Sequence, residues 1–481
     1  MTGTFTLPDT SALFIGGKWR PGAGIERIAV RNPATEQVIA DIPAGTEDDV
    51  DAACRAAADA LPVWSAVPPA ERAAACRAIS AELDARAEDL ADLVTADLGM
   101  PRAFARSVQV GLAVTDFANL ADAAEQHVYE REIGTSVVRE VPVGVVGAIT
   151  PWNFPLHQVA AKVGGALAAG APVVLKPSQV TPLGVFVLAD VIAGLGLPPG
   201  VFNLVSGAGA KVGEALVLHP VVDFVSFTGS TGAGARVATL AAGRVRPTAL
   251  ELGGKSPAVL LDDLDDSAFE KALRRVMAGS LLNSGQMCSA LTRIIVPEHR
   301  LDTAEQILAA AAGRFRAGDP FDPGVRLGPV VSEAQRTSVR GHIERAIAEG
   351  ARVVTGGPGA PDGLDTGYFV RPTVFSRVER NSAIVREEVF GPVLVVQTHR
   401  GTDDAVAVAN DTGYGLAAGV FGADAEAVAW RIRAGQVEVN GAGFDPAAPF
   451  GGFGDSGYGR EFGGWGIDDF LTTQAVQRWS P

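Results

Sequence analysis

The chain contains little cysteine: Cys54, Cys76 and Cys288 are the three thiols among 481 residues. An odd number of widely separated cysteines does not form a disulfide framework. No Cys-x-x-Cys pair and no Cys/His cluster occurs, so the sequence predicts no metal site. Each thiol is therefore either a packing residue or a reactive group.

Basic side chains are also scarce relative to acidic ones, 40 against 55, which gives a formal net charge of −15. Nucleic acids and anionic membranes bind basic surfaces, so this balance argues against both as partners. The longest apolar run, residues 183–197, contains Asp190 and is too short to span a bilayer. Because the N-terminus lacks a basic region followed by an apolar stretch, no signal peptide is predicted and a cytoplasmic protein is expected.

The composition itself is globular, with 47% hydrophobic and 20% charged residues, and the length suits roughly three packed units. The first 30 or so residues are rich in Gly and Pro and are predicted to be irregular. Two Ala-rich helices follow, one capped by Thr46 with Asp49 three residues on, the other beginning near Pro69. Cys54 and Cys76 fall at apolar positions of these helices and are predicted core residues, because a buried thiol behaves as a small hydrophobe.

From about residue 143 onwards, short β-branched runs alternate with helical stretches. The runs are 145–150, 172–178, 201–207 and 222–230, and the helices include 155–169 and 182–194, the latter with Thr181 as its cap. A second alternation begins near residue 257, with runs at 258–261, 293–296, 352–354, 393–396 and 436–439. This pattern predicts two α/β units with parallel sheets, whose ligands bind beyond the carboxyl ends of the strands. Two further strand-like segments, 136–141 and 470–479, stand outside both units.

Two glycine-rich turns follow predicted strands and begin helices: "SGAGAKVG" (206–213) and "FTGSTGAG" (227–234). The first has the spacing Gly207-x-Gly209-x-x-x-Gly213, one residue longer than the dinucleotide fingerprint. Small residues there let a phosphate approach the free N–H groups of a helix N-terminus. Each turn alone is equally consistent with a simple tight turn, but two in one sheet favour nucleotide binding.

Three other motifs contain polar side chains that are candidate binding or catalytic residues. "KPSQ" places Lys176 and Ser178 just past a strand, as hydrogen-bonding groups for a ribose or phosphate, or as an ordinary surface turn. "TPWNFP" fixes Asn153 between two prolines, and a fixed amide is a good donor toward developing negative charge; a structural Asn is the alternative. In "ELGGKSP" two glycines come shortly after Glu251, and we interpret them as giving substrate or water access to its carboxylate; an exposed turn glutamate is the alternative.

The third thiol, Cys288, lies in "NSGQMCSALT", among small and polar residues rather than at an apolar helical position. The small neighbours, Ser284, Gly285, Ser289 and Ala290, are interpreted as leaving room for a substrate carbonyl. A free thiol of pKa about 8.5 is only a few per cent ionised at pH 7, so its nucleophilicity depends on its surroundings. An inert buried thiol is the alternative, whereas the six histidines form no recognisable Cys–His hydrolase signature.

Taken together, "TPWNFP", "KPS", "FTGSTG", "ELGGKSP", "GQMC", "EEVFGPV" and "PFGG…SGYGRE" resemble the NAD(P)-dependent aldehyde dehydrogenase superfamily, in the family's order and over nearly the whole chain. The resemblance implies an α/β fold of two interleaved Rossmann-like three-layer domains with parallel-sheet cores and a β-strand arm. It divides the chain into a dinucleotide-binding domain (1–124 and 142–252), a catalytic domain (253–440) and an oligomerisation arm (125–141 and 466–481). A homodimer or homotetramer is the implied assembly.

The resemblance also implies a mechanism for oxidising a small-molecule aldehyde to its acid. Cys288 matches the nucleophile, and Asn153 with the Cys288 N–H matches the oxyanion donors. Glu251 matches the base that activates water to hydrolyse a thioester, Glu461 a proton relay, and Lys176 is included among the catalytic residues. Two alternatives are a CoA-acylating semialdehyde dehydrogenase, a branch that generally lacks this glutamate, and a catalytically silent member with a binding or structural role.

For the cofactor, the resemblance assigns Glu388 to the nicotinamide ribose and Lys176 to the adenosine ribose. Many NAD-preferring members have a glutamate where this chain has Gln179, and that carboxylate repels a 2′-phosphate. NAD is therefore expected as the main cofactor, with NADP as the alternative. The full set of implied cofactor residues is Ile149, Thr150, Pro151, Trp152, Lys176, Ser178, Gln179, Gly209, Gly213, Phe227, Thr228, Gly229, Ser230, Leu252, Gly253, Glu388 and Phe390.

For the substrate, Phe154, Phe444 and Phe450 are expected to supply an aromatic wall. After "PWNFP" come Leu156, His157, Gln158 and Ala161, where several members carry larger apolar or aromatic residues, which implies a wider and more polar tunnel. For His157, a passive surface or helix residue is the alternative. These positions do not name the aldehyde.

Overall fold

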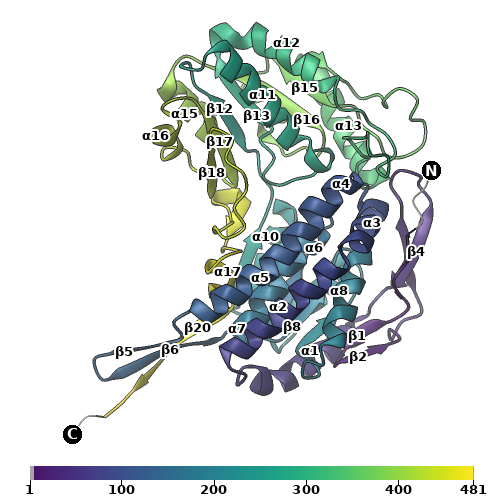
Figure 1. Cartoon of the computed structure of the whole chain (residues 1–481), viewed down its shortest axis with the longest axis vertical. Coiled ribbons are helices and arrows are strands. Elements are labelled where there is room, and N and C mark those ends of the chain that lie inside the picture. The colour runs from purple at the N-terminus through teal and green to yellow at the C-terminus, as the bar shows by residue number, and fades with distance from the viewer. Residues whose placement is uncertain (1–4, 480–481) are drawn as a thin grey trace.

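The computed structural model describes residues 5–479, so the ends of the outermost predicted ranges, residues 1–4 and 480–481, lie outside the described residues. Two large sheets, of eight and seven strands, form the centres of two lobes, and a three-stranded sheet projects away from them (Figure 1). The predicted α/β class with parallel-sheet cores is confirmed.

The eight-stranded sheet has the order β19-β11-β10-β7-β8-β9-β1-β2. Its central strands run parallel to their neighbours. All the runs predicted between residues 145 and 230 are strands of this sheet. The parallel strands are β7 (Val145–Ile149), β8 (Val173–Lys176), β9 (Phe202–Leu204), β10 (Val222–Thr228) and β11 (Thr248–Glu251).

Helices cover both faces of this sheet, which explains why β7 and β8 are buried along their whole length. Val146 and Ala148 pack into a core with helices α2, α5 and α8, whereas Val145 and Ile149 pack into a second core with α1, α9 and α10. The alternation of side chains along a strand therefore separates two cores, one on each face. This is the predicted three-layer arrangement.

The prediction that the first 30 or so residues are irregular is wrong. They contain β1 (Leu13–Ile15), β2 (Lys18–Arg20) and part of a hairpin made by β3 (Arg27–Arg31) and β4 (Val38–Pro43). β1 joins the sheet beside β9, with Phe14 opposite Leu204. β1 is held by this distant partner as well as by β2, whereas β3 pairs with β4, and the local Gly and Pro content gives no sign of these short pairings.

The predicted Ala-rich helices are α1 (Glu47–Trp64) and α2 (Pro69–Ala85). Thr46 caps α1 in a capping box with Asp49, and α2 begins at Pro69, both as predicted. Cys54 and Cys76 are completely buried in the two cores. The interpretation of these two thiols as packing residues is confirmed.

The predicted helix at 182–194 forms as α8 (Leu183–Gly194), but Thr181 is not its cap. The Thr181 hydroxyl donates to the Trp152 carbonyl at 2.8 Å. The free Leu183 N–H of the helix donates instead to Asp97 Oδ2 at 3.0 Å. A residue 86 positions away thus supplies the acceptor that the neighbouring hydroxyl was expected to provide.

The seven-stranded sheet has the order β14-β15-β16-β13-β12-β17-β18. The five predicted runs are all strands of it, whereas β15 and β17 were not predicted. Helices α11 and α12 cover one face and α13 to α16 the other. The strands are β12 (Pro257–Leu260), β13 (Arg293–Pro297), β14 (Arg352–Thr355), β15 (Thr373–Ser376), β16 (Val393–His399), β17 (Ala417–Phe421) and β18 (Gln436–Val439).

The remaining helices cover the two lobes or connect them. The predicted helix 155–169 is continuous but contains a π-helical turn at Ala160–Gly164. The helices are α3 (Ala87–Leu98), α4 (Arg102–Phe104), α5 (Gly111–Gln126), α6 (Pro155–Val159), α7 (Gly165–Ala169), α9 (Glu214–Leu218), α10 (Thr231–Ala242), α11 (Asp266–Ser280), α12 (Leu301–Ala312), α13 (Glu333–Ala348), α14 (Ala383–Arg386), α15 (Thr402–Asn410), α16 (Ala425–Ala429) and α17 (Trp465–Asp468).

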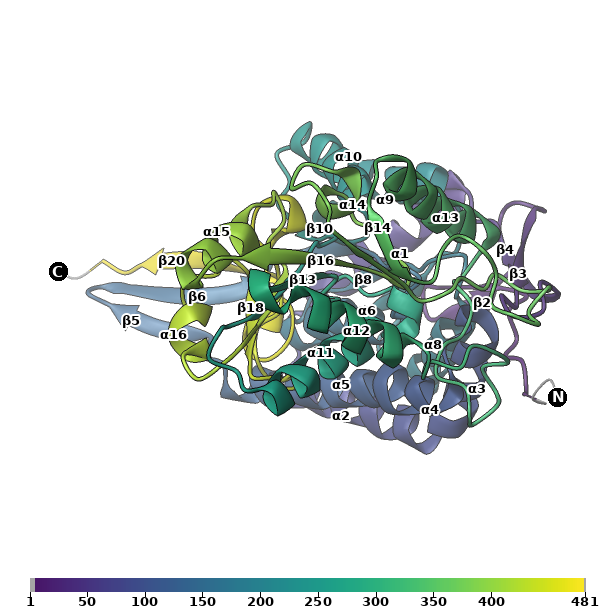
Figure 2. The ribbon, with the colours of Figure 1, turned by 90° about the horizontal axis from the view of Figure 1, so that it is seen from above.

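The two outlying segments pair with each other. β6 (Ser136–Pro142) lies between β5 (Glu130–Ile133) and β20 (Leu471–Gln477), antiparallel to both. Both views show this three-stranded sheet extending well beyond the two lobes (Figures 1 and 2). In the eight-stranded sheet, β19 (Gly457–Tyr458) is the edge strand farthest from β2 and pairs with β11. The chain therefore returns to the first lobe after it has formed the second.

None of the helices within residues 5–479 is both long and apolar enough to cross a membrane. Over the same residues, no group of three or more His, Cys, Asp and Glu side chains is arranged to hold a metal ion.

Candidate active site

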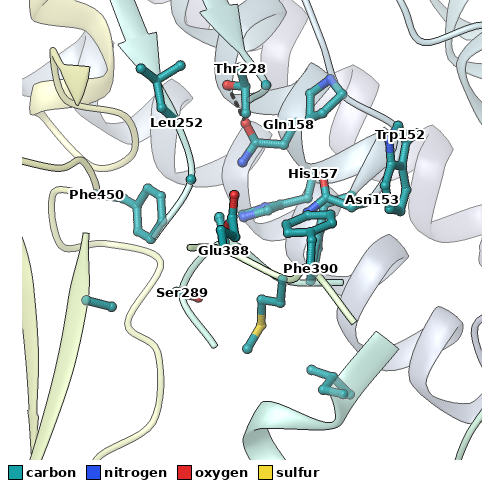
Figure 3. A pocket seen from close by; sticks show the side chains of 18 of the residues that line it. Trp152, Asn153, His157, Gln158, Thr228, Leu252, Ser289, Glu388, Phe390 and Phe450 are labelled. Atoms are coloured by element: carbon teal, nitrogen blue, oxygen red, sulfur yellow. Dashed lines mark hydrogen bonds between the residues drawn. The ribbon is translucent and has the colours of Figure 1, made fainter. Parts of the chain in front are cut away.

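A cavity of about 500 Å³ lies between the two lobes and is lined by residues from both sheets. Figure 3 shows its side chains converging from the first sheet, from α6 and from the loops before β13 and β16. It begins where β7, β10 and β11 end, as expected for a parallel sheet. The predicted site residues that line it are Pro151, Trp152, Asn153, Phe154, His157, Thr228, Gly229, Ser230, Leu252, Gly253, Cys288, Glu388, Phe390, Phe444 and Phe450.

Cys288 reaches this cavity on a loop with unusual backbone geometry. Asn283, Ser284 and Gly285 all have positive φ angles, of 50°, 56° and 76°. Gly285 is required, because a Cβ there would lie 2.1 Å from the Gly391 carbonyl oxygen. Such strained backbone persists only where the surroundings fix it, and it is concentrated at functional sites.

The interpretation of the small neighbours of Cys288 needs correction. Ser284 and Gly285 do not line the cavity: the Ser284 hydroxyl donates to the Gly328 carbonyl at 2.8 Å, and Gly285 packs on Gly391. Ala290 is buried, and only Ser289 of the four borders the cavity. The small residues therefore shape the loop that presents the thiol, because its backbone must pack closely against two other loops.

Asn153 is tied directly to this loop. Its side-chain amide donates to the Gln286 carbonyl at 3.2 Å, two residues before the thiol. Its backbone carbonyl accepts from Gln109 and from Asn283, both at 2.9 Å. An amide group carries two donor hydrogens, so one remains for an oxygen in the cavity. The structure brings Asn153 and Cys288 together as predicted.

The electrostatics of the cavity keep the thiol protonated at rest. Burial, with contributions from Glu388 and Glu251, raises the pKa of Cys288 to about 12. The loss of hydration on burial is the main reason for the shift, and the two carboxylates that a thiolate would face add to it. Cys288 can therefore act as a nucleophile only if its proton is removed as it reacts.

Glu251, at the end of β11, is buried, with 3% of its surface exposed, and neither carboxylate oxygen has a hydrogen-bond partner among the described residues. Burial and the nearby Glu461 raise the pKa of Glu251 well above its ordinary value, whereas Lys162 lowers it. A carboxyl with a raised pKa is suited to accept and release a proton near neutral pH. The alternative of an exposed turn glutamate is excluded by this burial.

Lys162 is the main functional candidate that the sequence interpretation missed. It lies in the π-helical turn after α6, only 1% exposed, with its Nζ 2.5 Å from Glu461 Oε1. The second Glu461 oxygen has no partner within the described chain. A lysine within the otherwise apolar and small run 159–171 could have indicated a buried ion pair, since such a cation needs an acidic partner.

The glycines of "ELGGKSP" also have a role different from the predicted one. A Cβ on Gly253 would lie 2.1 Å from Glu388 Oε2, and one on Gly254 would lie 2.6 Å from the Cys288 carbonyl oxygen. These glycines let Glu388 and the Cys288 backbone approach, rather than clear space around Glu251. The Gly254 N–H donates to Glu388 Oε1 at 3.1 Å, while burial raises the pKa of Glu388 to about 7.

A second part of the site lies at the ends of β7 and β8, where Ile149 and Lys176 are paired in register. A Cβ added to Gly213 would contact both side chains at 3.7 Å. Burial lowers the pKa of Lys176 to about 8, and among residues 5–479 its ammonium donates only to the Pro177 carbonyl, at 2.8 Å. Phe227 lies opposite Ile149 on β10, so these four predicted cofactor residues are close together.

Several of the other predicted cofactor residues have polar atoms without hydrogen-bond partners or border open space. Gln179 Oε1 and Thr150 Oγ1 have no hydrogen-bond partner among the described residues. Gly209 borders open space, because a Cβ there would meet no atom within 4 Å. Ser178 Oγ accepts the Val180 N–H at 3.1 Å, and Ser230 caps α10. Unpaired acceptors, a lysine with spare hydrogens and a helix N-terminus fit the ribose hydroxyls and phosphates of a dinucleotide.

The predicted aromatic wall is present and includes one more ring. Phe444 lies 6.1 Å from Phe450 and 6.0 Å from His157, and Phe154 lies 6.0 Å from His157. Phe462, which was not predicted, stacks on His157 with ring centres 4.6 Å apart. At the other end of the cavity, Trp152 meets Phe390 edge to face at 5.2 Å.

Comparison with known proteins gives the same family over nearly the whole chain. Residues 19–476 match the model of the aldehyde dehydrogenase family. A 3-succinoylsemialdehyde-pyridine dehydrogenase of a Pseudomonas species is 41% identical, with 98% of this chain and 99% of the relative covered. A mutant of aldehyde dehydrogenase C from Pseudomonas syringae, in complex with NAD+ and octanal, has a TM-score of 0.96 at 43% identity, with 98% of each chain covered.

Betaine aldehyde dehydrogenase from Staphylococcus aureus, in complex with NAD+, has a TM-score of 0.94 at 35% identity, covering 97% of this chain and 94% of that one. The family match, the relatives and the geometry of the site agree. This chain belongs to the aldehyde dehydrogenase family.

Proposed function

We propose that the protein oxidises an aldehyde to its carboxylic acid with NAD, using Cys288 as a covalent nucleophile. Membership of the family makes the chain an oxidoreductase of this class. The observation that carries the assignment of the nucleophile is that Cys288 lines the same cavity as Asn153, Glu388 and Phe390. A single thiol therefore faces both an amide donor and the residues suited to a nicotinamide ribose.

In the first step, Cys288 Sγ attacks the aldehyde carbon and forms a thiohemiacetal. Because the pKa of Cys288 is raised to about 12, its proton leaves as the carbon–sulfur bond forms. That proton passes to water, and Glu251 contributes to the shift through its negative charge. The second hydrogen of the Asn153 amide and the Cys288 N–H stabilise the developing oxyanion, and one such donor is worth roughly 3 kcal/mol.

The residues of the first lobe would hold NAD with Lys176 and Gln179 at the adenosine ribose and Glu388 at the nicotinamide ribose. The unpaired acceptors at Thr150 and Gln179 and the open space at Gly209 support this placement. Bound NAD supplies the acceptor for the hydride whose loss leaves a thioester on Cys288.

Hydrolysis of that thioester is assigned to Glu251. A buried carboxyl with a raised pKa can take a proton from water, and Lys162 with Glu461 can pass it on. The presence of Glu251 supports water as the acyl acceptor over CoA. Burst kinetics test this step: the amount of NADH formed in the first turnover is measured against the steady-state rate.

NAD is proposed over NADP as the main cofactor. Two structural neighbours were crystallised with NAD+. Gln179 has a neutral amide at a position where a carboxylate would repel the 2′-phosphate of NADP. The preference for NAD over NADP is therefore expected to be modest. The comparison of kcat/KM for the two cofactors decides the question; a tenfold preference for NADP would contradict the proposal.

The proposed substrate is an uncharged aldehyde of medium length. Octanal in the complex of the P. syringae neighbour and the 3-succinoylsemialdehyde-pyridine named for the Pseudomonas relative both exceed the smallest aldehydes in size. A cavity of about 500 Å³ with Phe154, Phe444 and Phe450 on its wall suits such chains. His157 adds a polar group to that wall.

The three-stranded sheet is proposed as the arm of a homodimer or homotetramer, with residues 125–141 and 466–481. β5 and β20 are its outer strands and are mostly exposed, and an exposed strand edge can pair with another copy. The division into a cofactor domain (1–124, 142–252) and a catalytic domain (253–440) stays a proposal; the separation of the two large sheets supports it, although β19 joins the first sheet from outside these ranges. A cytoplasmic location suits the free thiol of Cys288, which a reducing compartment preserves.

The decisive experiment is NADH formation with a panel of aldehydes, with wild type beside Cys288→Ala. Activity should be present in the wild type and absent in the variant, while both proteins bind NAD. Equal rates in both would remove Cys288 as the nucleophile. Mass spectrometry of the enzyme trapped during turnover with aldehyde and NAD should locate the acyl adduct on Cys288.

A further inference from the structure

A buried acid–imidazole pair faces the proposed substrate cavity. His157 on α6 has Nδ1 2.6 Å from Asp116 Oδ2 on α5. The Asp116 side chain is completely buried, and the His157 side chain is 8% exposed. His157 lines the cavity, whereas Asp116 lies behind it. Figure 3 shows the His157 side chain reaching into the cavity beside Asn153 and Gln158.

The second ring nitrogen, Nε2, has no hydrogen-bond partner among the described residues. Phe462 stacks on the imidazole at 4.6 Å, and Phe154 and Phe444 contact its edges, so rings surround it on the remaining sides. The Asp116 oxygen that does not bind His157 is also unpaired within the described chain. The pair therefore has one unsatisfied group directed at the cavity, and that group is Nε2.

The number of protons that Asp116 and His157 share determines whether Nε2 is a hydrogen-bond donor or an acceptor. Burial raises the pKa of Asp116, and Glu461 raises it further, while His157 lowers it. Because burial favours the protonated form of Asp116, its carboxyl donates to Nδ1, and the imidazole carries its own hydrogen on Nε2. In that state one proton lies between Asp116 and Nδ1 and the other is on Nε2. The cavity is thus presented with an N–H donor.

The remaining charges lining the cavity are acidic. Its described lining contains Glu388 and Glu438 and neither Lys nor Arg. Burial raises the pKa of both Glu388 and Glu438, which reflects how poorly this region accommodates negative charge. A carboxylate-bearing aldehyde would meet these two acids without a cation to bind it. A neutral acceptor avoids that cost and can still pair with the donor.

We infer that His157, held by Asp116, selects uncharged aldehydes that carry a hydrogen-bond acceptor oxygen or nitrogen along their chain. This inference rests on the proposed function and names its substrate class. His157 binds the acceptor through Nε2–H, and Asp116 is a positioning residue that fixes the ring and its protons. A purely aliphatic aldehyde leaves the N–H unpaired in an aromatic pocket, so it binds less well than a matched acceptor-bearing chain.

The test compares octanal with a series in which each internal methylene in turn is replaced by an ether oxygen. At one position of the series, the wild type should give a kcat/KM about tenfold above that of octanal, the factor that corresponds to 1.4 kcal/mol. The gain should lie in KM with kcat unchanged, because the contact is made equally in the ground state and in the transition state.

Two variants separate this role from a structural one. His157→Leu removes the donor but leaves Asp116 buried alone, so the double variant Asp116→Leu/His157→Leu, which removes both polar groups, is measured beside it. In the double variant the preference for the ether should disappear and octanal should improve. Phe444→Leu, which alters the same wall without removing the donor, should change both substrates by a similar factor.

The inference is overturned if the wild type oxidises octanal and every ether with the same kcat/KM, or if the double variant retains the preference while remaining folded. In either case oxidation of octanal continues, so the dehydrogenase function is left intact. Absence of NADH formation with every aldehyde would instead overturn the proposed function and this inference with it.

Discussion

Replacement of Lys162 by methionine removes the cation that faces two buried carboxyls. Lys162 and Glu461 have side chains only 1% and 7% exposed and are 2.5 Å apart. Removal of one partner of such a buried pair leaves an uncompensated charge and typically costs about 3–5 kcal/mol of stability. Lys162→Met should therefore lower the free energy of unfolding by that amount, whereas Lys271→Met, on the exposed side of α11, should change it by less than about 0.5 kcal/mol.

The same change should move the pH dependence of turnover. Lys162 lowers the pKa of Glu251 and Glu461 raises it. A base must be ionised to activate water, so the rate of thioester hydrolysis rises with pH through the pKa of Glu251. Loss of Lys162 raises that pKa and should shift the acid limb of kcat to higher pH, whereas Glu461→Gln should shift it to lower pH.

The assays are urea unfolding followed by tryptophan fluorescence, and steady-state NADH formation between acid and neutral pH. The double variant Lys162→Met/Glu461→Leu should recover most of the lost stability, because it replaces both charges by apolar groups. Shifts of the acid limb in the same direction for Lys162→Met and Glu461→Gln would refute the reasoning. So would a double variant as unstable as the single one.

Four further outcomes follow from the site. Cys288→Ala should abolish NADH formation with every aldehyde while leaving the melting temperature within a few degrees of wild type, as measured by calorimetry. Glu251→Gln should retain an NADH burst but slow the steady state; an unaltered steady-state rate would exclude it as the sole base. Gln179→Glu should lower kcat/KM with NADP about tenfold, with little effect on NAD, because a carboxylate repels a 2′-phosphate. Gly253→Ala should raise KM for NAD, because its Cβ would lie 2.1 Å from Glu388; unchanged cofactor kinetics would contradict that packing.

The parts of the fold that depend on local chemistry could be predicted from the sequence. The capping box of Thr46 and Asp49 and the start of α2 at Pro69 involve neighbouring residues only. The parallel strands of both sheets carry their β-branched residues in continuous runs, because they are buried on both faces. These signals remain visible however the rest of the chain is arranged.

The parts that depend on distant partners could not be predicted in this way. The acceptor at the start of α8 comes from Asp97 rather than from Thr181, and the partner of Lys162 is 299 residues away. β1 pairs locally with β2, but its place in the sheet depends on the distant β9. In the site, the motifs indicated Cys288, Asn153 and Glu251, whereas the pairing of His157 with Asp116 depends on the packing of α5 against α6.

The pairing of β11 with β19 has a consequence for the synthesis of the protein. Glu251 ends β11, yet the strand beside it, together with Phe450 and Glu461, comes from the last 32 residues of the chain. During synthesis, Glu251 is therefore made well before the segment that surrounds it, and the pocket is complete only once residues 450–461 have folded back onto the first lobe.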